Sequence, residues 1–353
     1  MSARNAPAPC APQQTTPAPR AVVSAVVLCY RNADDVDDCL RAVERALAPW
    51  PSQVVVVDNA SDDGTVDVVR RTHPEVDLVA RTDNDGFARG CHVGAGRTSG
   101  EWILFVNPDA VVSPDAVSQL LSAAREHPEA GILGGRALHP DGRVDPRSWW
   151  GRPTLWSTFC FATGLSALRP GHPVLDPEAP DRWDGSAREV PVVSGAMMLV
   201  QRAVWESLGG FDRDLLLYGE DVDLCLRARR AGWRPRVVPS ATFVHAVGGS
   251  TPGPLRTVLV MRGRASVLRR HLPWGTRRLG AGLLVLGVGL RAMASGARTA
   301  RREAATDPAG WRAAWTARRR WWHGWQPGEE LVQVVADDAR AIADGRHLTR
   351  SSR

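Results

Sequence analysis

Lysine is absent from the 353 residues, so all 44 side chains counted as lysine or arginine are arginine. Without lysine the chain cannot form the Gly-x-x-x-x-Gly-Lys phosphate loop, which excludes that class of nucleoside triphosphatase. The six cysteines contain no Cys-x-x-Cys pair, so neither a zinc site nor a disulfide framework is indicated, and a reducing compartment is expected. The N-terminal stretch lacks the apolar core of a secretory signal, so export is not expected.

The bulk composition is that of an ordinary globular protein, with 44% hydrophobic and 23% charged residues. The net charge of +6 is less ordinary. Because it comes from arginine alone, it suits phosphate recognition, although a GC-rich genome would produce the same bias. The length allows one large α/β domain with an appendage, or two domains.

Apolar, β-branched runs alternate with helical patterns from Ala21 onward, which predicts a mostly parallel sheet with right-handed crossovers. The expected strands are 22–29, 53–57, 76–80 and 102–106. The expected helices are about 34–48, with Asp34 and Asp35 in its first turn, 65–72 and 113–127. Residues 134–190 show no reliable period and are expected to be loop-like, with a role in covering a substrate. Beyond them we expect a strand at 192–200, a helix at 221–231, and extended pieces at 236–238 and 242–245.

The domain organisation expected from these patterns has three parts. Residues 1–20, rich in proline and alanine, are predicted to be a disordered tail, 21–250 to form the catalytic domain, and 251–353 to form a basic helical region rich in tryptophan. The apolar run 279–290 in this last region is shorter than the about 18 residues that span a bilayer, so no transmembrane helix is expected.

Five tryptophans of the C-terminal region alternate with arginines, a pattern that allows two interpretations. Arginine and tryptophan on one segment suit a membrane interface, which would make the protein peripheral on the cytoplasmic face of the membrane. Alternatively, the tryptophans pack a helical appendage against the core. The residues are Trp311, Trp315, Trp321, Trp322 and Trp325.

Three acidic positions carry the candidate chemistry. Asp58 and Asp109 each follow an apolar strand, and the pair Glu220-Asp221 stands at a predicted helix start. Asp109 could hold a divalent cation together with a substrate diphosphate. Asp58 could accept a hydrogen bond from a pyrimidine ring or a ribose hydroxyl, and Asp221 could act as a general base. Any one of these acids alone is more often structural, so the joint pattern carries the hypothesis.

The motifs around these acids resemble those of family-2 glycosyltransferases with the GT-A fold, and most closely the bacterial rhamnosyltransferase-like enzymes of cell-surface polysaccharide synthesis. The resemblance covers about residues 22–250, in the family's order. The matching segments are Val-Val-Val-Val-Asp-Asn-Ala-Ser-Asp-Asp-Gly-Thr (54–65), Asp-Asn-Asp-Gly-Phe-Ala-Arg-Gly (83–90), Asn-Pro-Asp-Ala (107–110), Gly-Gly-Phe-Asp (209–212) and Tyr-Gly-Glu-Asp-Val-Asp-Leu-Cys-Leu-Arg (218–227).

The resemblance implies an inverting sugar transfer from a nucleoside diphosphate donor with Mg²⁺ or Mn²⁺. Asp58 matches the aspartate that contacts the base, and Asn84 and Asn107 fall in the donor-binding motifs. Asp221 matches the catalytic base and Glu220 its neighbour. The donor expected from the resemblance is dTDP-rhamnose, with a UDP-sugar as the alternative, and the acceptor is a cell-surface glycan or a polyprenyl-diphosphate-linked molecule.

The metal site is implied by the same resemblance. Asp109 matches the last residue of the metal-binding Asp-x-Asp motif, and His245 matches a histidine near the diphosphate or metal. A structural role for His245 is the alternative. Asn107 replaces the first aspartate of the motif, which removes one charge from the site.

Two further departures from the family's pattern concern Arg31 and the Cys91-His92 pair, which put the fine donor contacts in doubt. A catalytically inactive binding protein on the same fold remains an alternative. Binding of nucleic acid by the basic C-terminal region is not expected, because no nucleic-acid-binding module is visible.

Overall fold

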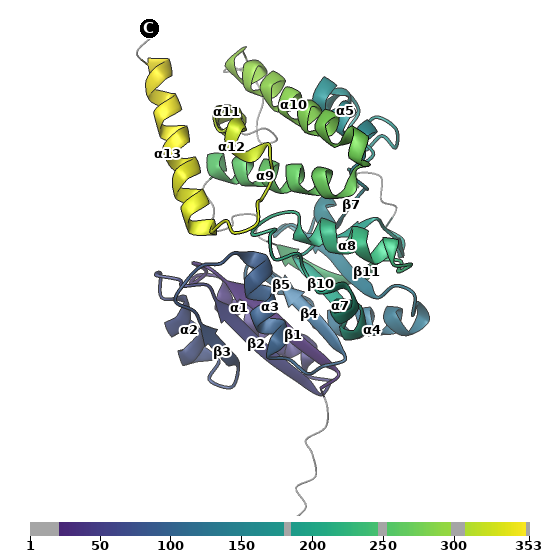
Figure 1. Ribbon diagram of the computed structural model, residues 1–353. Coiled ribbons are helices and arrows are strands. Elements are labelled where there is room, and N and C mark those ends of the chain that lie inside the picture. The colour runs from purple at the N-terminus through teal and green to yellow at the C-terminus, as the bar shows by residue number, and fades with distance from the viewer. Residues whose placement is uncertain (1–20, 180–184, 246–252, 298–307, 351–353) are drawn as a thin grey trace, which may run out of the picture.

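The computed structural model describes residues 21–179, 185–245, 253–297 and 308–350 (Figure 1). The predicted tail 1–20 lies outside the described residues. The strands are β1 Val23–Cys29, β2 Ser52–Asp58, β3 Asp77–Ala80, β4 Trp102–Val106, β5 Ala110–Val112, β6 Ile132–Leu138, β7 Trp149–Trp150, β8 Arg188–Glu189, β9 Val192–Val193, β10 Met197–Gln201 and β11 Arg236–His245.

Helices alternate with these strands in the first half of the chain and dominate its end. The α-helices of the sheet region are α1 Val36–Leu47, α2 Thr65–Thr72, α3 Phe87–Gly96, α4 Ala116–Glu126, α5 Leu155–Thr163, α6 Leu165–Leu168, α7 Arg202–Leu208 and α8 Glu220–Arg230. The α-helices of the C-terminal region are α9 Gly253–His271, α10 Arg277–Ala297, α11 Pro308–Thr316, α12 Arg318–Trp321 and α13 Leu331–Arg350. Two short 3-10 helices, η1 Pro146–Ser148 and η2 Trp274–Thr276, complete the described elements.

One mixed sheet of nine strands forms the centre of the molecule, in the order β3-β2-β1-β4-β10-β6-β11-β5, with β8 paired to β11. The strands predicted first, β1 to β4, pair in parallel, as expected. β10 runs antiparallel between β4 and β6, so the second half of the sheet is mixed. All seven residues of β1 are buried, because this strand lies inside the sheet with helices on both of its faces.

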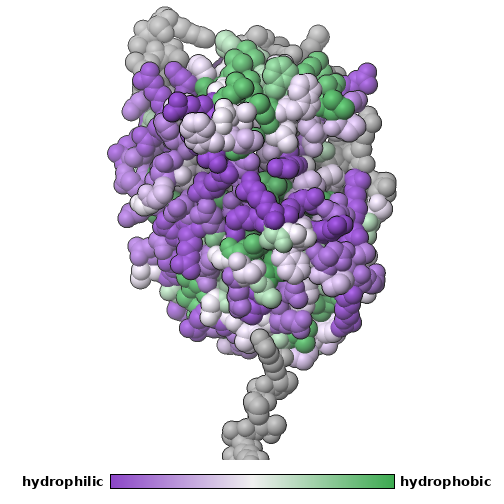
Figure 2. Space-filling view, turned by 45° about the vertical axis from the view of Figure 1, so that its right-hand side comes forward, coloured by the Kyte–Doolittle hydropathy of each residue, from purple (hydrophilic) through white to green (hydrophobic). Residues whose placement is uncertain are grey.

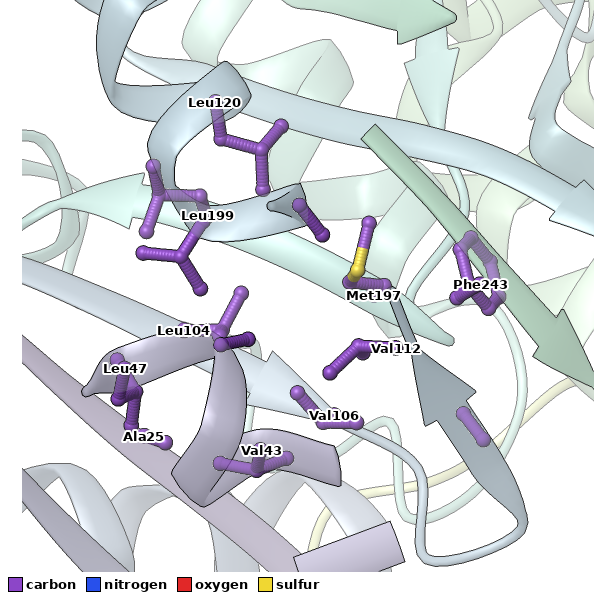
Figure 3. Packing of buried hydrophobic residues seen from close by; sticks show 14 of the residues in the cluster. Ala25, Val43, Leu47, Leu104, Val106, Val112, Leu120, Met197, Leu199 and Phe243 are labelled. Carbon is purple, nitrogen blue, oxygen red and sulfur yellow. The ribbon is translucent and has the colours of Figure 1, made fainter. Parts of the chain in front are cut away.

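The two faces of the sheet carry separate hydrophobic clusters because successive strand residues point to opposite sides. Ala25 and Val27 of β1 pack with α1 and α4, in the cluster that Figure 3 shows with Leu104 and Leu120. Val26 points to the opposite face, where α3, α7 and α8 pack.

The expectation that residues 134–190 are loop-like is wrong, and the two longest elements within them show why. These residues include most of β6, which pairs with both β10 and β11. Gly134 and Gly135 interrupt its apolar pattern because a Cβ there would lie 2.2 Å from Val193 and 2.1 Å from Met197. They also include α5, which begins with a capping box between Thr154 and Ser157 but is apolar nearly all round, so its sequence shows no helical period.

Two other strand boundaries differ from the prediction. The single strand expected at 192–200 is divided into β9 and β10 by Ser194-Gly195-Ala196. The two pieces expected at 236–238 and 242–245 form one strand, β11, with a shift of register between Val238 and Thr242. Pro239 lies in this shift, where the lack of an N–H is tolerated.

The C-terminal helices form a third hydrophobic cluster of their own above the sheet region (Figure 1). Trp321 is 0% exposed and Trp325 is 2% exposed, and both indole N–H groups donate to backbone carbonyls, those of Ala314 and Leu217. For these two tryptophans, packing of an appendage is therefore the correct interpretation. Trp315 and Trp322 keep 39% and 36% of their surface.

α10 is longer than the apolar run expected at 279–290. It is the one helix in the described ranges that is long and apolar enough to cross a membrane, by length and composition alone. One side of it packs against α5, α9 and α11. The glycines on that side permit close approach, since a Cβ on Gly287 would lie 2.7 Å from Phe161 and one on Gly289 would lie 2.7 Å from Trp315.

Candidate active site

Asp58 and Asp109 lie at the same edge of the sheet. Asp58 is the last residue of β2, in register with Cys29 at the end of β1. β4 runs parallel to β1 and ends at Val106, so the following Asn107-Pro108-Asp109 emerges at the carboxyl ends of the same strands. Ligands of open α/β sheets bind at this edge.

Asp58 is buried, and its two carboxylate oxygens differ. Oδ2 accepts a hydrogen bond from the Ser61 backbone N–H at 2.9 Å. Oδ1 is buried without a hydrogen-bond partner among the described residues. A buried acceptor without a donor costs about 1–3 kcal/mol, so Oδ1 is suited to a donor that a ligand brings.

Asn84 contacts Asn59, the residue that follows Asp58. Its side-chain oxygen accepts from the Gly86 backbone N–H at 3.0 Å and from the Asn59 amide at 3.4 Å. Its observed contacts shape the turn before α3, and its role in donor binding stays a prediction.

The backbone at the same edge of the sheet is unusual at two residues. Ala60 and Arg31 have positive φ angles of 61° and 58°. Residues other than glycine adopt this conformation rarely, and many of those that do lie at functional sites.

Asp109 and His245 contact each other. β5 and β11 are antiparallel with Ala110 opposite His245, and this register brings His245 Nε2 to 3.1 Å from Asp109 Oδ1. The Asp109 side chain is 12% exposed and that of His245 is 21% exposed, so both can be reached by a ligand. Asn107 contributes its backbone to the same turn, with its N–H donating to the Ala196 carbonyl.

Asp35, at the start of α1, is a further acid of this corner that the sequence analysis treated only as part of a helix start. Burial, and after it the charge of Asp109, raise the pKa of Asp35. Its position after β1 in a parallel sheet was the signal that could have placed it beside Asp109.

Glu220 and Asp221 begin α8 and are held differently. Asp221 Oδ2 accepts from the Gly195 backbone N–H at 3.0 Å, which attaches the start of α8 to the residues just before β10. Because Met197 of β10 is opposite Val106 of β4, this contact places Asp221 at the same edge of the sheet as Asp109. The sheet thus brings the three predicted acidic positions to one edge.

The two carboxyl groups are electrostatically linked. Burial, and then the charge of Asp221, raise the pKa of Glu220 to about 8. Burial also raises the pKa of Asp221, although the N–H groups of Gly195 and Val222 act in the opposite direction. Glu220 Oε2 has no hydrogen-bond partner within the described part of the chain. The buried pair therefore holds protons more tightly than two free carboxyl groups would, with burial as the main cause.

The loop before α8 is supported by α9, a connection that the sequence analysis missed. Tyr218 has a φ of 65°, and a Cβ on Gly263 of α9 would lie 2.2 Å from the Tyr218 carbonyl oxygen. The buried Asp223 of α8 is 2.7 Å from His271 Nε2 of α9. Burial favours a higher pKa for Asp223, but His271 and Arg227 outweigh burial and lower it.

A second group of potential metal ligands, Glu44, His73 and Glu75, lies elsewhere. Glu44 and Glu75 line a cavity of about 410 Å³ with Ser52 and Gln53, at the opposite end of β2 from Asp58. The buried His73 ring is 2.7 Å from Glu44 and 3.0 Å from Asp37, which accounts for both of its nitrogens. We interpret the group as an ion-pair cluster that joins α1 to α2.

The fold, together with the acids at the carboxyl edge of the sheet, indicates a class of protein. A mostly parallel sheet with acids at its carboxyl edge and an acid pair at the start of a nearby helix is the arrangement expected of a GT-A glycosyltransferase. The model of the glycosyltransferase-like family 2 matches residues 19–324, and the chain belongs to this family. The predicted family and class of enzyme are therefore confirmed.

Relatives of known activity and structure agree with this assignment. The chain is 31% identical over 241 residues to the N-acetylglucosaminyl-diphospho-decaprenol L-rhamnosyltransferase of Mycobacterium tuberculosis, covering 65% of this chain and 78% of that protein. This similarity agrees with the predicted rhamnosyltransferase-like branch. The mannosyltransferase PcManGT of Pyrobaculum calidifontis, solved with GDP-Man and Mn²⁺, aligns with a TM-score of 0.50 and 19% identity over 95% of this chain and 90% of that chain. The structural similarity confirms the GT-A fold.

Proposed function

We propose that this enzyme transfers rhamnose from dTDP-rhamnose, with inversion, to a hydroxyl of a polyprenyl-diphosphate-linked glycan at the cytoplasmic face of the membrane. The observation that carries the proposal is the placement of Asp58, Asp109 and Asp221 at one edge of the sheet. The similarity to a rhamnosyltransferase that acts on a decaprenol-linked sugar supports the choice of donor and acceptor.

The residues perform separate tasks in this proposal. Asp58 Oδ1 accepts a hydrogen bond from the donor's base or ribose. Asp221 removes the proton from the acceptor hydroxyl, whose oxygen attacks the anomeric carbon from the face opposite the diphosphate, and the bond from that carbon to the diphosphate oxygen breaks. Burial raises the pKa of Asp221, which strengthens it as a proton acceptor for the hydroxyl.

The residues around Asp109 fit a divalent cation. Asp109 offers a carboxylate oxygen and His245 an imidazole nitrogen, 3.1 Å apart. Because these two residues supply only one carboxylate, oxygens of the donor diphosphate would provide further ligands. Such a mixed set of ligands suits Mn²⁺ or Mg²⁺. Asp109 and His245 would hold the ion, which when bound neutralises charge on the leaving diphosphate.

The test is calorimetric binding of dTDP-rhamnose, UDP-glucose, UDP-N-acetylglucosamine and UDP-galactofuranose with Mn²⁺, Mg²⁺ or a chelator, followed by a transfer assay. We expect metal-dependent binding of one donor, weakened by about tenfold or more in Asp109→Ala. Asp221→Asn should bind that donor normally yet transfer about 10²–10⁴-fold more slowly. The matched control is Asp141→Asn, an exposed carboxylate in a loop, paired with Arg143.

Three results separate the alternatives. Binding of a UDP-sugar alone would retain the enzyme class and replace the donor. Binding without transfer to any acceptor would support an inactive binding protein. Near-normal transfer by Asp221→Asn would refute its assignment as the base.

A further inference from the structure

α10 is apolar on all sides, yet only one side is covered by protein. Its packed side contains Gly280, Gly287 and Gly289, which contact side chains of Leu272, Phe161 and Trp315. A helix that is apolar all round is normally buried all round. The opposite side is instead exposed, with Leu279 at 54%, Leu286 at 49%, Leu290 at 41% and Met293 at 67%.

The exposed apolar surface continues onto α5, which packs against α10. Trp156 and Phe159 stack on each other with ring centres 5.5 Å apart, and they keep 46% and 38% of their surface. Figure 2 shows hydrophobic residues gathered at this end of the molecule. We call this surface the apolar face, made of Trp156, Phe159, Leu279, Leu286, Leu290 and Met293.

Helices α9 and α10 carry charges of one sign. No aspartate or glutamate occurs in the sequence between Asp223 and Glu303. Exposed arginines stand at the ends of the elements that form the face: Arg278 is the second residue of α10, Arg152 precedes α5 and Arg169 follows α6. Trp274, 86% exposed, precedes the same end of α10. Leucine and tryptophan bordered by arginine suit the boundary between anionic headgroups and acyl chains.

We propose that the apolar face docks in the interface of an anionic lipid bilayer. The proposal deepens the proposed function, because an acceptor linked to a polyprenyl chain must be met at a membrane. α10 lies along the surface rather than across it, since crossing would separate Gly287 and Gly289 from α5 and α11. A helix in this position inserts its exposed side by about 5–10 Å.

The apolar face is tied to the catalytic residues through α9. α10 packs on α9. α9 in turn contacts the Tyr218 carbonyl through Gly263, and Arg270 of α9 is 2.8 Å from Asp212 of the Gly-Gly-Phe-Asp turn. Docking of the apolar face would therefore hold the loop before Asp221 at a fixed height above the bilayer.

The test is co-sedimentation of the full chain with vesicles of phosphatidylcholine alone or mixed with phosphatidylglycerol, without nucleotide or metal. We expect binding to the mixed vesicles that weakens as salt is raised. The double variant Leu286→Glu/Leu290→Glu should partition at least about tenfold less. The matched control Val332→Glu, on α13 and 59% exposed in the wild type, should stay within about twofold of the wild type.

Failure of the docking proposal can be told apart from failure of the proposed function. The proposed function is measured by donor binding and by transfer to a water-soluble acceptor. Both should be unchanged in Leu286→Glu/Leu290→Glu. Absence of vesicle binding by the wild type, or equal binding by the double variant, would overturn the docking proposal. A wild-type dimer that the double variant converts to a monomer would also overturn it, since the apolar face would then contact a second copy.

Discussion

Buried carboxylates at the carboxyl edge of the sheet and in the helical C-terminal region have opposite surroundings. In the C-terminal region they are paired with arginine: Asp338, 0% exposed, contacts both Arg262 and Arg320, and Glu329 also contacts Arg262. At the edge of the sheet, Asp58 Oδ1 and Glu220 Oε2 are buried without a partner in the described residues. Removing one partner of a buried ion pair destabilises a fold, whereas an unpaired buried acid can still accept a hydrogen bond from a substrate.

Breaking the buried ion pair between Asp338 and Arg262 is expected to have the largest effect on stability. In Asp338→Ala, Arg262, which is 2% exposed in the wild type, loses its carboxylate at 3.0 Å and keeps only that of Glu329 at 3.2 Å. Removing one partner of a buried pair costs about 3–5 kcal/mol, and the remaining Glu329 should place the loss toward the lower end. Thermal unfolding should show this loss, whereas the control Asp141→Ala, whose partner Arg143 is 82% exposed, should lose about 1 kcal/mol or less. Equal losses in the two variants would contradict the comparison between buried and exposed pairs.

The two regions also meet where α9 packs against the loop before α8. Gly263→Ala adds a Cβ 2.2 Å from the Tyr218 carbonyl oxygen, so α9 or the loop before Glu220 must move. We expect destabilisation of about 1–3 kcal/mol and a lower kcat with little change in donor affinity. Calorimetry and steady-state kinetics measure the two effects.

Gly282→Ala is the matched control for that substitution. Gly282 lies on α10 with nothing within 4 Å of its added Cβ. A glycine replaced by alanine inside a helix should then stabilise by about 0.5–1 kcal/mol. If Gly263→Ala behaves like Gly282→Ala, the appendage does not support the catalytic loop.

The parts of the molecule that the sequence predicted are those governed by local pattern. β1, α1, β2 and α2 follow from periodic runs, and the shared edge of Asp58 and Asp109 follows from parallel pairing. β6 and α5 escaped prediction because tertiary contacts, rather than period, select their residues.

Contacts between residues far apart in the sequence also could not be predicted from local patterns. Asp109 and His245 are 136 residues apart, so only the family resemblance brought His245 into the site. The contact of Gly263 with Tyr218, like the pair Arg262 and Asp338, had no signal in the sequence, because no local pattern specifies which helix faces which loop.

The last prediction concerns Glu220→Gln, which tests the unpaired acid directly and has its smallest effect in acid. Burial, and then Asp221, raise the pKa of Glu220 from 4.5 to about 8, so the folded protein holds this proton more tightly than the unfolded chain. The stability contributed by that proton is fully present below the lower value and is lost as the pH rises through the higher one. Glutamine keeps the neutral group at every pH, so the variant should match the wild type below about pH 4.5 and become the more stable of the two as the pH rises to about 8. Denaturant unfolding across this pH range would reveal a flatter profile for the variant than for the wild type. Parallel profiles would mean that folding does not raise the pKa of Glu220.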